Sequence, residues 1–156
     1  SVRVSLTNQQ RIIVLRQDAA DREAALRRLA GEFLGKGLVA ETFPQAVLDR
    51  EQRYPTGLGL GELGVAIPHT DPEHVLRPQL GFMSLATPVR FRQMGDESAT
   101  ADVSLIIMLA LHKSEDQLPM LQQLMGLFQD RSSLDSLVAA TAADQVVEVF
   151  AGAGIH

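Results

Sequence analysis

The chain has 156 residues, of which 46% are hydrophobic and 21% charged, enough for one domain with a hydrophobic core over residues 1–156. Its net charge of −5 disfavours a nucleic-acid-binding protein, which usually has a basic surface. The absence of cysteine excludes disulfides and zinc–thiolate sites and is consistent with a cytoplasmic protein. The longest apolar run, residues 103–111, is too short to cross a bilayer.

A short strand and two helices are predicted at the start of the chain. The β-branched run at residues 11–16 indicates a strand. Asp18 or Asp21 can cap a helix that places its apolar side chains on one face and ends near Gly35. A second helix is predicted over residues 42–53, because a proline in its first turn favours helix initiation.

Residues 54–64 are rich in glycine and are predicted to form a flexible loop. The spacing of Gly57, Gly59 and Gly61 has a superficial likeness to a nucleotide-binding loop. It is not the Gly-x-Gly-x-x-Gly spacing, and no helix is predicted directly after it. A phosphate cradle of that type is therefore disfavoured.

The middle of the chain predicts the centre of a sheet. Residues 80–86 indicate a strand, Pro88 a turn and residues 89–91 a short partner strand, followed by an exposed loop over residues 93–100. Residues 103–111 are apolar throughout, which is typical of a central strand buried on both faces.

Three helices are predicted in the last third of the chain. Ser114 and Gln117 have the spacing of a capping box in front of a leucine-rich run. Further helices are predicted near residues 134–140 and 146–150, and Thr141 is the predicted cap of the last one. Strands and helices therefore alternate, which predicts an α/β fold with helices covering a sheet.

The most informative stretch is Leu63–His74, a predicted buried strand that leads to a histidine. Val65 and Ile67 favour the strand, and Pro68 is expected to end its pairing because proline has no backbone N–H. His69 would then lie at the end of a stiff strand, beside a turn. Because a neutral imidazole nitrogen is a nucleophile, His69 is a candidate phosphoryl carrier; the alternative is a histidine that only hydrogen-bonds the turn.

A metal site is a second hypothesis for the same stretch. His69, Asp71 and His74 lie within six residues of one another. Their spacing is not a standard metal-binding one, and the proline between them disfavours a helix that would align the three side chains. We therefore predict no metal and no other cofactor.

Arg50 and Glu51 stand near the end of the second predicted helix. A charged helix end is usually exposed to solvent, and that is one interpretation of this pair. The other is that the guanidinium of Arg50 lies over a bound phosphoryl group and offers it a fork of N–H donors.

Three motifs together resemble a known protein family. They are Leu48-Asp49-Arg50-Glu51, Pro55-Thr56-Gly57 and Gly64-Val65-Ala66-Ile67-Pro68-His69. With these motifs the chain resembles the IIA components of the bacterial sugar phosphotransferase system, in the fructose–mannitol or type-2 superfamily. The resemblance covers nearly the whole chain. Gln117 and the Pro55-Thr56-Gly57 segment with its glycine-rich extension are closer to the galactitol-type members than to the mannitol and fructose ones.

The resemblance implies a fold, a reaction and partners. The fold would be a three-layer α/β/α sandwich around a central mixed sheet. His69 would be phosphorylated by the phosphocarrier protein HPr and would pass the group to a IIB domain, which phosphorylates a sugar entering through the membrane component IIC. Arg50 matches the family arginine that stabilises the phosphohistidine. Sugar specificity lies mainly in the membrane component, so this chain does not identify the sugar.

The chain departs from the family at a second histidine. Mannitol and fructose members carry it at the start of the helix after the central strand, where this chain has Gln117. A glutamine can donate an N–H to a phosphoryl oxygen but supplies no charge, and His112 is the alternative residue for that role. This difference keeps open a regulatory IIA-like module, of the nitrogen branch or of a sugar-responsive regulator, whose phosphorylation controls protein binding.

A relay between proteins also requires a surface on which partners dock transiently. Four apolar residues are predicted to form such a rim around His69: Leu58, Leu60, Val75 and Leu76.

Overall fold

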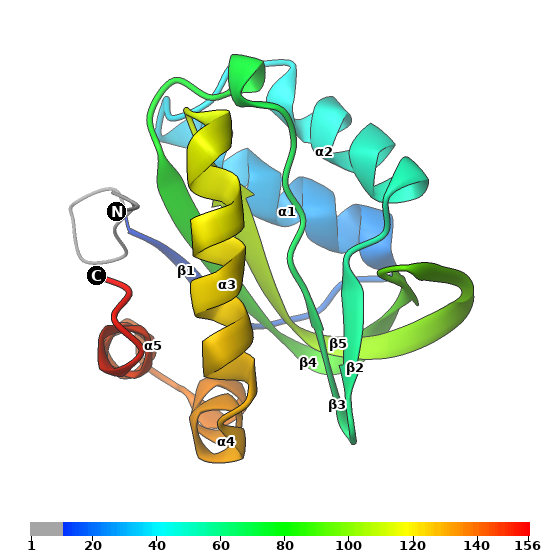
Figure 1. Cartoon of the computed structure of the whole chain (residues 1–156), viewed down its shortest axis with the longest axis vertical. Coiled ribbons are helices and arrows are strands. Elements are labelled where there is room, and N and C mark those ends of the chain that lie inside the picture. Colours follow the sequence, from blue (N-terminus) through cyan, green and yellow to red (C-terminus); the bar gives the residue numbers. More distant parts are fainter. Residues whose placement is uncertain (1–10) are drawn as a thin grey trace.

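The computed structural model describes residues 11–156 and has helices on both faces of a five-stranded sheet (Figure 1). No helix within that range is long and apolar enough to cross a membrane. In chain order the elements are β1 (Ile12–Gln17), α1 (Arg22–Gly35), α2 (Phe43–Arg53), β2 (Gly57–Leu60), β3 (Leu63–Ala66), η1 (Pro72–His74), β4 (Gln79–Gln93), β5 (Asp96–Ala110), η2 (Ser114–Asp116), α3 (Gln117–Phe128), α4 (Arg131–Ala139) and α5 (Ala143–Gly152).

The sheet is mixed, as predicted. β4 pairs in parallel with β1 and in antiparallel with β5. β5 also pairs in parallel with β3, and β3 pairs in antiparallel with β2. A further pairing between Gly57 and Gln93 joins β2 to the far end of β4. Both β4 and β5 therefore have partners on two sides over part of their length.

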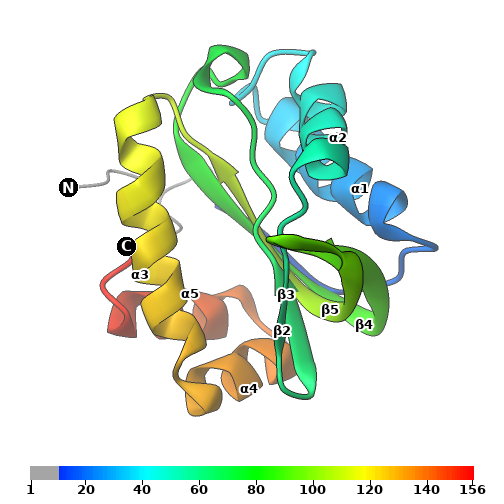
Figure 2. The same ribbon diagram turned by 45° about the vertical axis from the view of Figure 1, so that its right-hand side comes forward.

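The predicted three-layer α/β/α sandwich is confirmed. α1 and α2 cover one face of the sheet, and α3, α4 and α5 cover the other (Figure 2). Successive residues of β5 alternate between these two cores: Ile106 and Met108 pack on the side of α1 and α2, whereas Ile107 and Leu109 pack on the side of α3. The prediction that this strand is buried on both faces is also confirmed.

The first two helices begin where their sequences predict. The carboxylate of Asp21 accepts a hydrogen bond from the backbone N–H of Ala24 at 2.8 Å, so Asp21 rather than Asp18 caps α1. Thr42 is the N-cap residue of α2, and Pro44 lies in its first turn.

The glycine-rich segment is a β-hairpin, so the predicted flexible loop is wrong. Gly57 to Leu60 pair with Leu63 to Ala66, and Gly61 takes a positive φ of 78° at the turn. The glycines also permit close packing of backbones. A Cβ on Gly64 would collide with the carbonyl oxygen of Asp102 on β5.

β4 and β5 form one long two-stranded ladder, so the predicted turn at Pro88 and the loop at residues 93–100 are wrong. Pro88 lies within β4, where the pairing with β5 is irregular between Ser84 and Val89. A proline is tolerated there because no regular ladder hydrogen bond is lost. The chain reverses only near Gly95, which has a φ of 78°.

The predicted caps of α3 and α5 are wrong. A short 3₁₀ turn, Ser114–Asp116, precedes α3, and the side chain of Ser114 makes no capping hydrogen bond. At α5 the side-chain oxygen of Gln145 accepts the backbone N–H groups of Thr141 and Ala142 at 2.7 and 3.1 Å. The glutamine, not the threonine, therefore satisfies this helix start.

We predict that Gly64→Ala lowers the free energy of unfolding by about 1–3 kcal/mol, because the new methyl group meets the backbone of β5. Gly59→Ala is the matched control. Its nearest neighbour is the side chain of Gln93 at 3.7 Å, so the methyl group has room. Urea unfolding of both variants measures the difference, and equal stability of the two would contradict this packing.

Candidate functional site

The sheet fixes the position of His69 through β5. The carbonyl of Pro68 accepts a hydrogen bond from the N–H of Leu109 at 3.0 Å, and His69 forms a parallel bridge with the same residue. The prediction that the strand stops at Pro68 is confirmed in part: β3 ends at Ala66, but pairing with β5 continues at one point, because proline loses only its donor and its carbonyl still accepts. His69 is held at the level of a buried central strand.

One nitrogen of the His69 ring is already engaged. Nδ1 lies 2.9 Å from the backbone carbonyl of Ile67. A carbonyl only accepts hydrogen bonds, so Nδ1 carries the proton and Nε2 carries the lone pair of the neutral ring. The hydrogen bond thus selects the tautomer in which Nε2 is the nucleophile.

The surroundings of His69 favour the neutral ring. Burial lowers the pKa of His69 below its ordinary value of 6.5, and the positive charge of Arg50 lowers it further. The Ile67 carbonyl and the carboxylate of Asp71 act in the opposite direction but do not outweigh burial. Near pH 7 the imidazole is therefore unprotonated at Nε2.

The predicted open position of His69 needs a correction, because only 8% of the residue is exposed. Its Nε2 is nevertheless accessible. Nε2 of His69 has no hydrogen-bond partner within residues 11–156. The only fully buried side-chain nitrogen or oxygen of that range without a partner is Nε of Arg50. Nε2 of His69 is therefore not fully buried, and it keeps contact with solvent.

Arg50 reaches the segment around His69 from the last turn of α2. Its Nη1 lies 3.5 Å from a carboxylate oxygen of Asp71, and its Cζ lies 5.1 Å from the ring centroid of Tyr54. Both partners are largely exposed, with 66% of the Asp71 side chain and 61% of Tyr54 accessible. Such an ion pair is weak, so the guanidinium is held in place but remains available to an anion.

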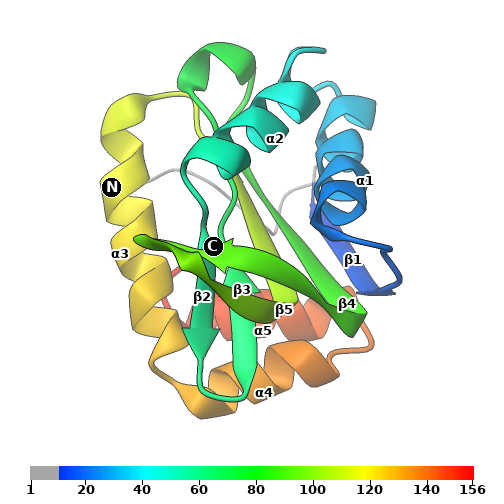
Figure 3. The same ribbon diagram turned by 90° about the vertical axis from the view of Figure 1, so that its right-hand side faces the viewer.

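A hollow of about 600 Å³ opens beside this pair. The segment that follows β3 runs between α2 and the start of α3 (Figures 1 and 3). The hollow lies on the α2 side of that segment and is lined by Thr42, Gln45, Ala46, Asp49, Arg50, Arg53, Tyr54, Thr70, Asp71 and His74.

The three residues of the metal hypothesis do not assemble into a site. Nδ1 of His74 lies 2.7 Å from the hydroxyl of Thr42, so His74 is tied to the start of α2. No group of three or more histidine or acidic side chains in the described part of the chain is arranged to hold a metal ion. His69, Asp71 and His74 are close in sequence but do not converge on one point.

His112 and Gln117 follow the end of β5, past Leu109. Nδ1 of His112 lies 2.9 Å from the backbone carbonyl of Val75, and Gln117 is the first residue of α3. In the described part of the chain, neither of these side chains forms a hydrogen bond with His69. Their role beside the histidine stays a prediction.

The predicted apolar rim is wrong in part. Val75 is buried, and Leu60 pairs with Leu63 six residues before His69, which places it roughly 20 Å away along the strand. Leu76 is 58% exposed, as a docking residue would be. Tyr54 and Leu118 are also exposed apolar side chains, and the sequence prediction missed them because a helix end gives no signal of its exposed face.

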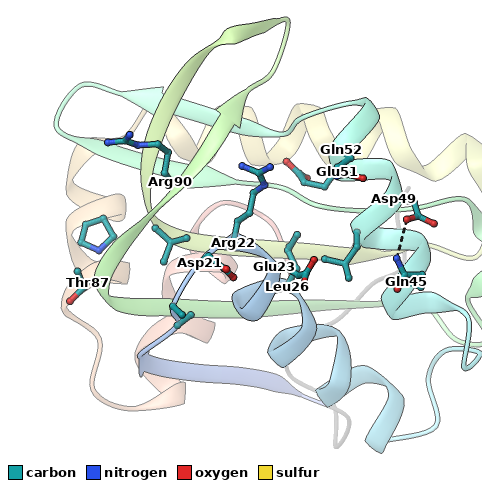
Figure 4. A pocket seen from close by; sticks show the side chains of 15 residues that line it. Asp21, Arg22, Glu23, Leu26, Gln45, Asp49, Glu51, Gln52, Thr87 and Arg90 are labelled. Atoms are coloured by element: carbon teal, nitrogen blue, oxygen red, sulfur yellow. Dashed lines mark hydrogen bonds between the residues drawn. The ribbon is translucent and has the colours of Figure 1, made fainter.

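Glu51 is a second buried titratable group, so the interpretation of the charged helix end as exposed to solvent is wrong for this residue. It is 4% exposed and accepts hydrogen bonds from the N–H and the hydroxyl of Thr56 at 2.7 and 2.8 Å. Burial raises the pKa of Glu51 from 4.5 to about 7, although the bonds from Thr56 and the charges of Arg22 and Arg92 lower it. Figure 4 shows the guanidinium of Arg22 beside this carboxylate.

Comparison with known proteins gives one consistent result. Residues 5–152 match the family model described as Phosphoenolpyruvate-dependent sugar phosphotransferase system, EIIA 2. A galactitol-specific EIIA component from Escherichia coli is 34% identical over 118 residues, which cover 76% of this chain and 78% of that protein. The mannitol-specific EIICBA component of that species is 35% identical over 144 residues, which cover 90% of this chain and 21% of that longer protein.

Two solved structures from Escherichia coli are similar in fold and sequence. One is the complex of enzyme IIAMTL with phosphorylated enzyme IIBMTL, with a TM-score of 0.75 and 30% identity over 93% of this chain and 96% of that chain. The other is the crystal structure of IIA mannitol, with a TM-score of 0.72 and 31% identity over 88% of this chain and 94% of that chain.

The raised pKa of Glu51 predicts a specific pH dependence of stability. The folded state binds this proton more tightly than the unfolded state, so stability falls as the pH rises from 4.5 through 7. The loss from this group is about 3 kcal/mol at most. Glu51→Gln should therefore show a smaller loss between pH 5 and pH 8 than the unmodified chain.

Urea unfolding of both proteins at pH 5 and pH 8 measures this difference. The lowered pKa of His69 acts in the opposite direction, but both proteins carry that histidine, so its effect cancels in the comparison. Identical pH dependence in the two proteins would contradict the raised pKa of Glu51.

Proposed function

The chain belongs to the EIIA 2 family of the phosphoenolpyruvate-dependent sugar phosphotransferase system and is a phosphoryl-transfer component of that system; we propose that it carries the phosphoryl group on Nε2 of His69. The observation that supports this residue is the hydrogen bond from Nδ1 to the Ile67 carbonyl. It leaves the lone pair of Nε2 on a neutral ring that still contacts solvent.

In the proposed reaction the lone pair of Nε2 attacks the phosphorus atom of the donor. A P–N bond forms, the bond between phosphorus and the donor atom breaks, and its electron pair leaves with the donor. The proton on Nδ1 stays with the imidazole, where the Ile67 carbonyl stabilises the positive charge that develops on the ring. The second transfer is the reverse step, towards a nucleophile of the acceptor protein.

Arg50 is the proposed electrostatic stabiliser of the phosphoryl oxygens. Its Nε is fully buried without a hydrogen-bond partner, and its Nη1 lies 3.5 Å from a carboxylate oxygen of the exposed Asp71. An anion on His69 would give both groups a better acceptor, because a charge-assisted hydrogen bond to a phosphoryl oxygen is stronger than a neutral one. Gln117 and His112 are the candidates for additional donors from the α3 side.

The proposed donor is the phosphocarrier protein HPr, and the proposed acceptor is a IIB domain that serves a membrane IIC component during sugar uptake. The likeness to IIAMTL in its complex with phosphorylated IIBMTL supports the acceptor. Exposed Tyr54, Leu76 and Leu118 offer apolar contacts for transient docking. The location proposed for this relay is the cytoplasm.

A regulatory role is the second candidate, because neither His112 nor Gln117 hydrogen-bonds His69 in the described structure. In that case phosphorylation of His69 would change the binding of another protein. Incubation of the phosphorylated chain with a IIB domain separates the two roles: transfer to IIB within minutes supports uptake, and retention of the group supports regulation.

We predict that incubation with phosphoenolpyruvate, enzyme I and HPr adds one phosphoryl group, which is acid-labile. His69→Ala should abolish the addition because it removes the nucleophile, whereas His74→Ala should retain it because that ring is tied to Thr42. Intact-protein mass spectrometry at neutral pH measures both. Labelling that persists in His69→Ala would reject the assignment of this residue.

Arg50→Ala should slow the transfer and leave the fold intact, since about a third of this side chain is exposed. Loss of one or more charge-assisted hydrogen bonds costs about 1.5–3 kcal/mol, or roughly 10- to 100-fold in rate. Arg50→Lys should recover only part of the rate, because an ammonium lacks the fork of donors. Quench-flow with phospho-HPr measures the rates, and a wild-type rate in Arg50→Ala would remove this residue from the site.

A further inference from the structure

The connection between α2 and β2 is held by hydrogen bonds that Arg50 and Glu51 accept from residues of the connection. The carbonyl of Arg50 accepts the N–H of Tyr54 at 2.7 Å, which closes the last turn of α2. The next residue, Glu51, spans the connection and accepts both the N–H and the hydroxyl of Thr56. The segment that carries Arg50 is therefore fastened to the residue directly before β2.

The connection between α2 and β2 is also linked to the segment of His69, through the pairing of β2 with β3. Thr56 precedes Gly57, and Gly57 pairs with Ala66, three residues before His69. Gly57 itself is packed so closely that a Cβ would lie 2.6 Å from the backbone oxygen of Arg92. Movement at Thr56 is thus restricted from the sheet side, and Glu51 transmits that restriction to α2.

Glu51 occupies a costly position for a carboxylate at a helix end. It is 4% exposed, whereas Gln52, Arg53 and Tyr54 beside it are exposed. Its carboxylate lies at the wall of a second hollow, of about 680 Å³, between α1, α2 and β4, with Arg22 on α1 beside it (Figure 4). Burial of an ionised acid is unfavourable unless hydrogen bonds compensate it, and the two bonds from Thr56 offset part of that cost.

We propose that Glu51 is a positioning residue for phosphoryl transfer: through its two hydrogen bonds to Thr56 it fixes the guanidinium of Arg50 relative to Nε2 of His69. This inference rests on the proposed function of His69 and Arg50. Glu51 does not touch the phosphoryl group itself. Its effect is exerted entirely through the α2–β2 connection.

Substitutions at the two ends of this link separate positioning from general stability. Thr56→Ser keeps the N–H and a hydroxyl donor, so it is the conservative control. Thr56→Val keeps the shape and the N–H but removes the hydroxyl donor. Glu51→Met keeps approximately the volume but removes both acceptor oxygens, which breaks both bonds to Thr56.

The experiment follows phosphorylation of the full chain by phospho-HPr and the lifetime of the phosphorylated product. Glu51→Met and Thr56→Val should lower the maximal rate on the order of tenfold and shorten the lifetime of the P–N bond. The HPr concentration for half-maximal rate should not change, because the docking surface is intact. Thr56→Ser should behave as the unmodified chain.

A double-mutant cycle with Arg50→Ala tests the path of the effect. If Glu51 acts through Arg50, then Glu51→Met causes no further loss in the Arg50→Ala background. Equal, additive losses in both backgrounds would overturn the proposal, and so would wild-type rates in both Glu51→Met and Thr56→Val. Absence of labelling in the unmodified chain would instead reject the proposed function. If Glu51→Met does not fold, the comparison of Thr56→Val with Thr56→Ser decides the same question.

Discussion

The site depends on one backbone hydrogen bond, from the N–H of Leu109 to the carbonyl of Pro68. β5 is packed between two hydrophobic cores, so Leu109 has little freedom to move. The bond extends this rigidity past the end of β3, to the residue before His69. A histidine on an ordinary loop would lose its orientation between encounters with partner proteins, whereas this one is held by the centre of the sheet.

Burial then acts on two titratable side chains in opposite directions. It lowers the pKa of His69 and raises that of Glu51, because a poorly hydrated environment disfavours the charged form of either group. The imidazole is neutral near pH 7 and Glu51 is only partly ionised. Arg50 is left as the strong charge beside His69, and its exposed partner Asp71 neutralises it only weakly. The neighbourhood is therefore suited to an incoming anion.

The elements that the sequence predicted well are those with an unambiguous local signal. The apolar run of β5, the Asp21 cap and Pro44 in the first turn of α2 have the same meaning in any fold. The glycine-rich hairpin and Pro88 were mispredicted, because glycine and proline also occur where backbones pack closely or where a ladder is irregular. Those uses depend on neighbours that are distant in sequence, and they have no local pattern.

The sequence alone determined the fold class, through the alternation of predicted strands and helices, and it named the candidate nucleophile His69 and the candidate stabiliser Arg50, since each of these two lies in a motif of consecutive residues. Only the tertiary structure decided which ring nitrogen of His69 is free, how far the ring is buried, and that Glu51 is fastened to Thr56. The physical reason is that tautomer, hydration and pKa depend on the three-dimensional surroundings of a side chain. A residue's type and its place in a motif do not specify those surroundings.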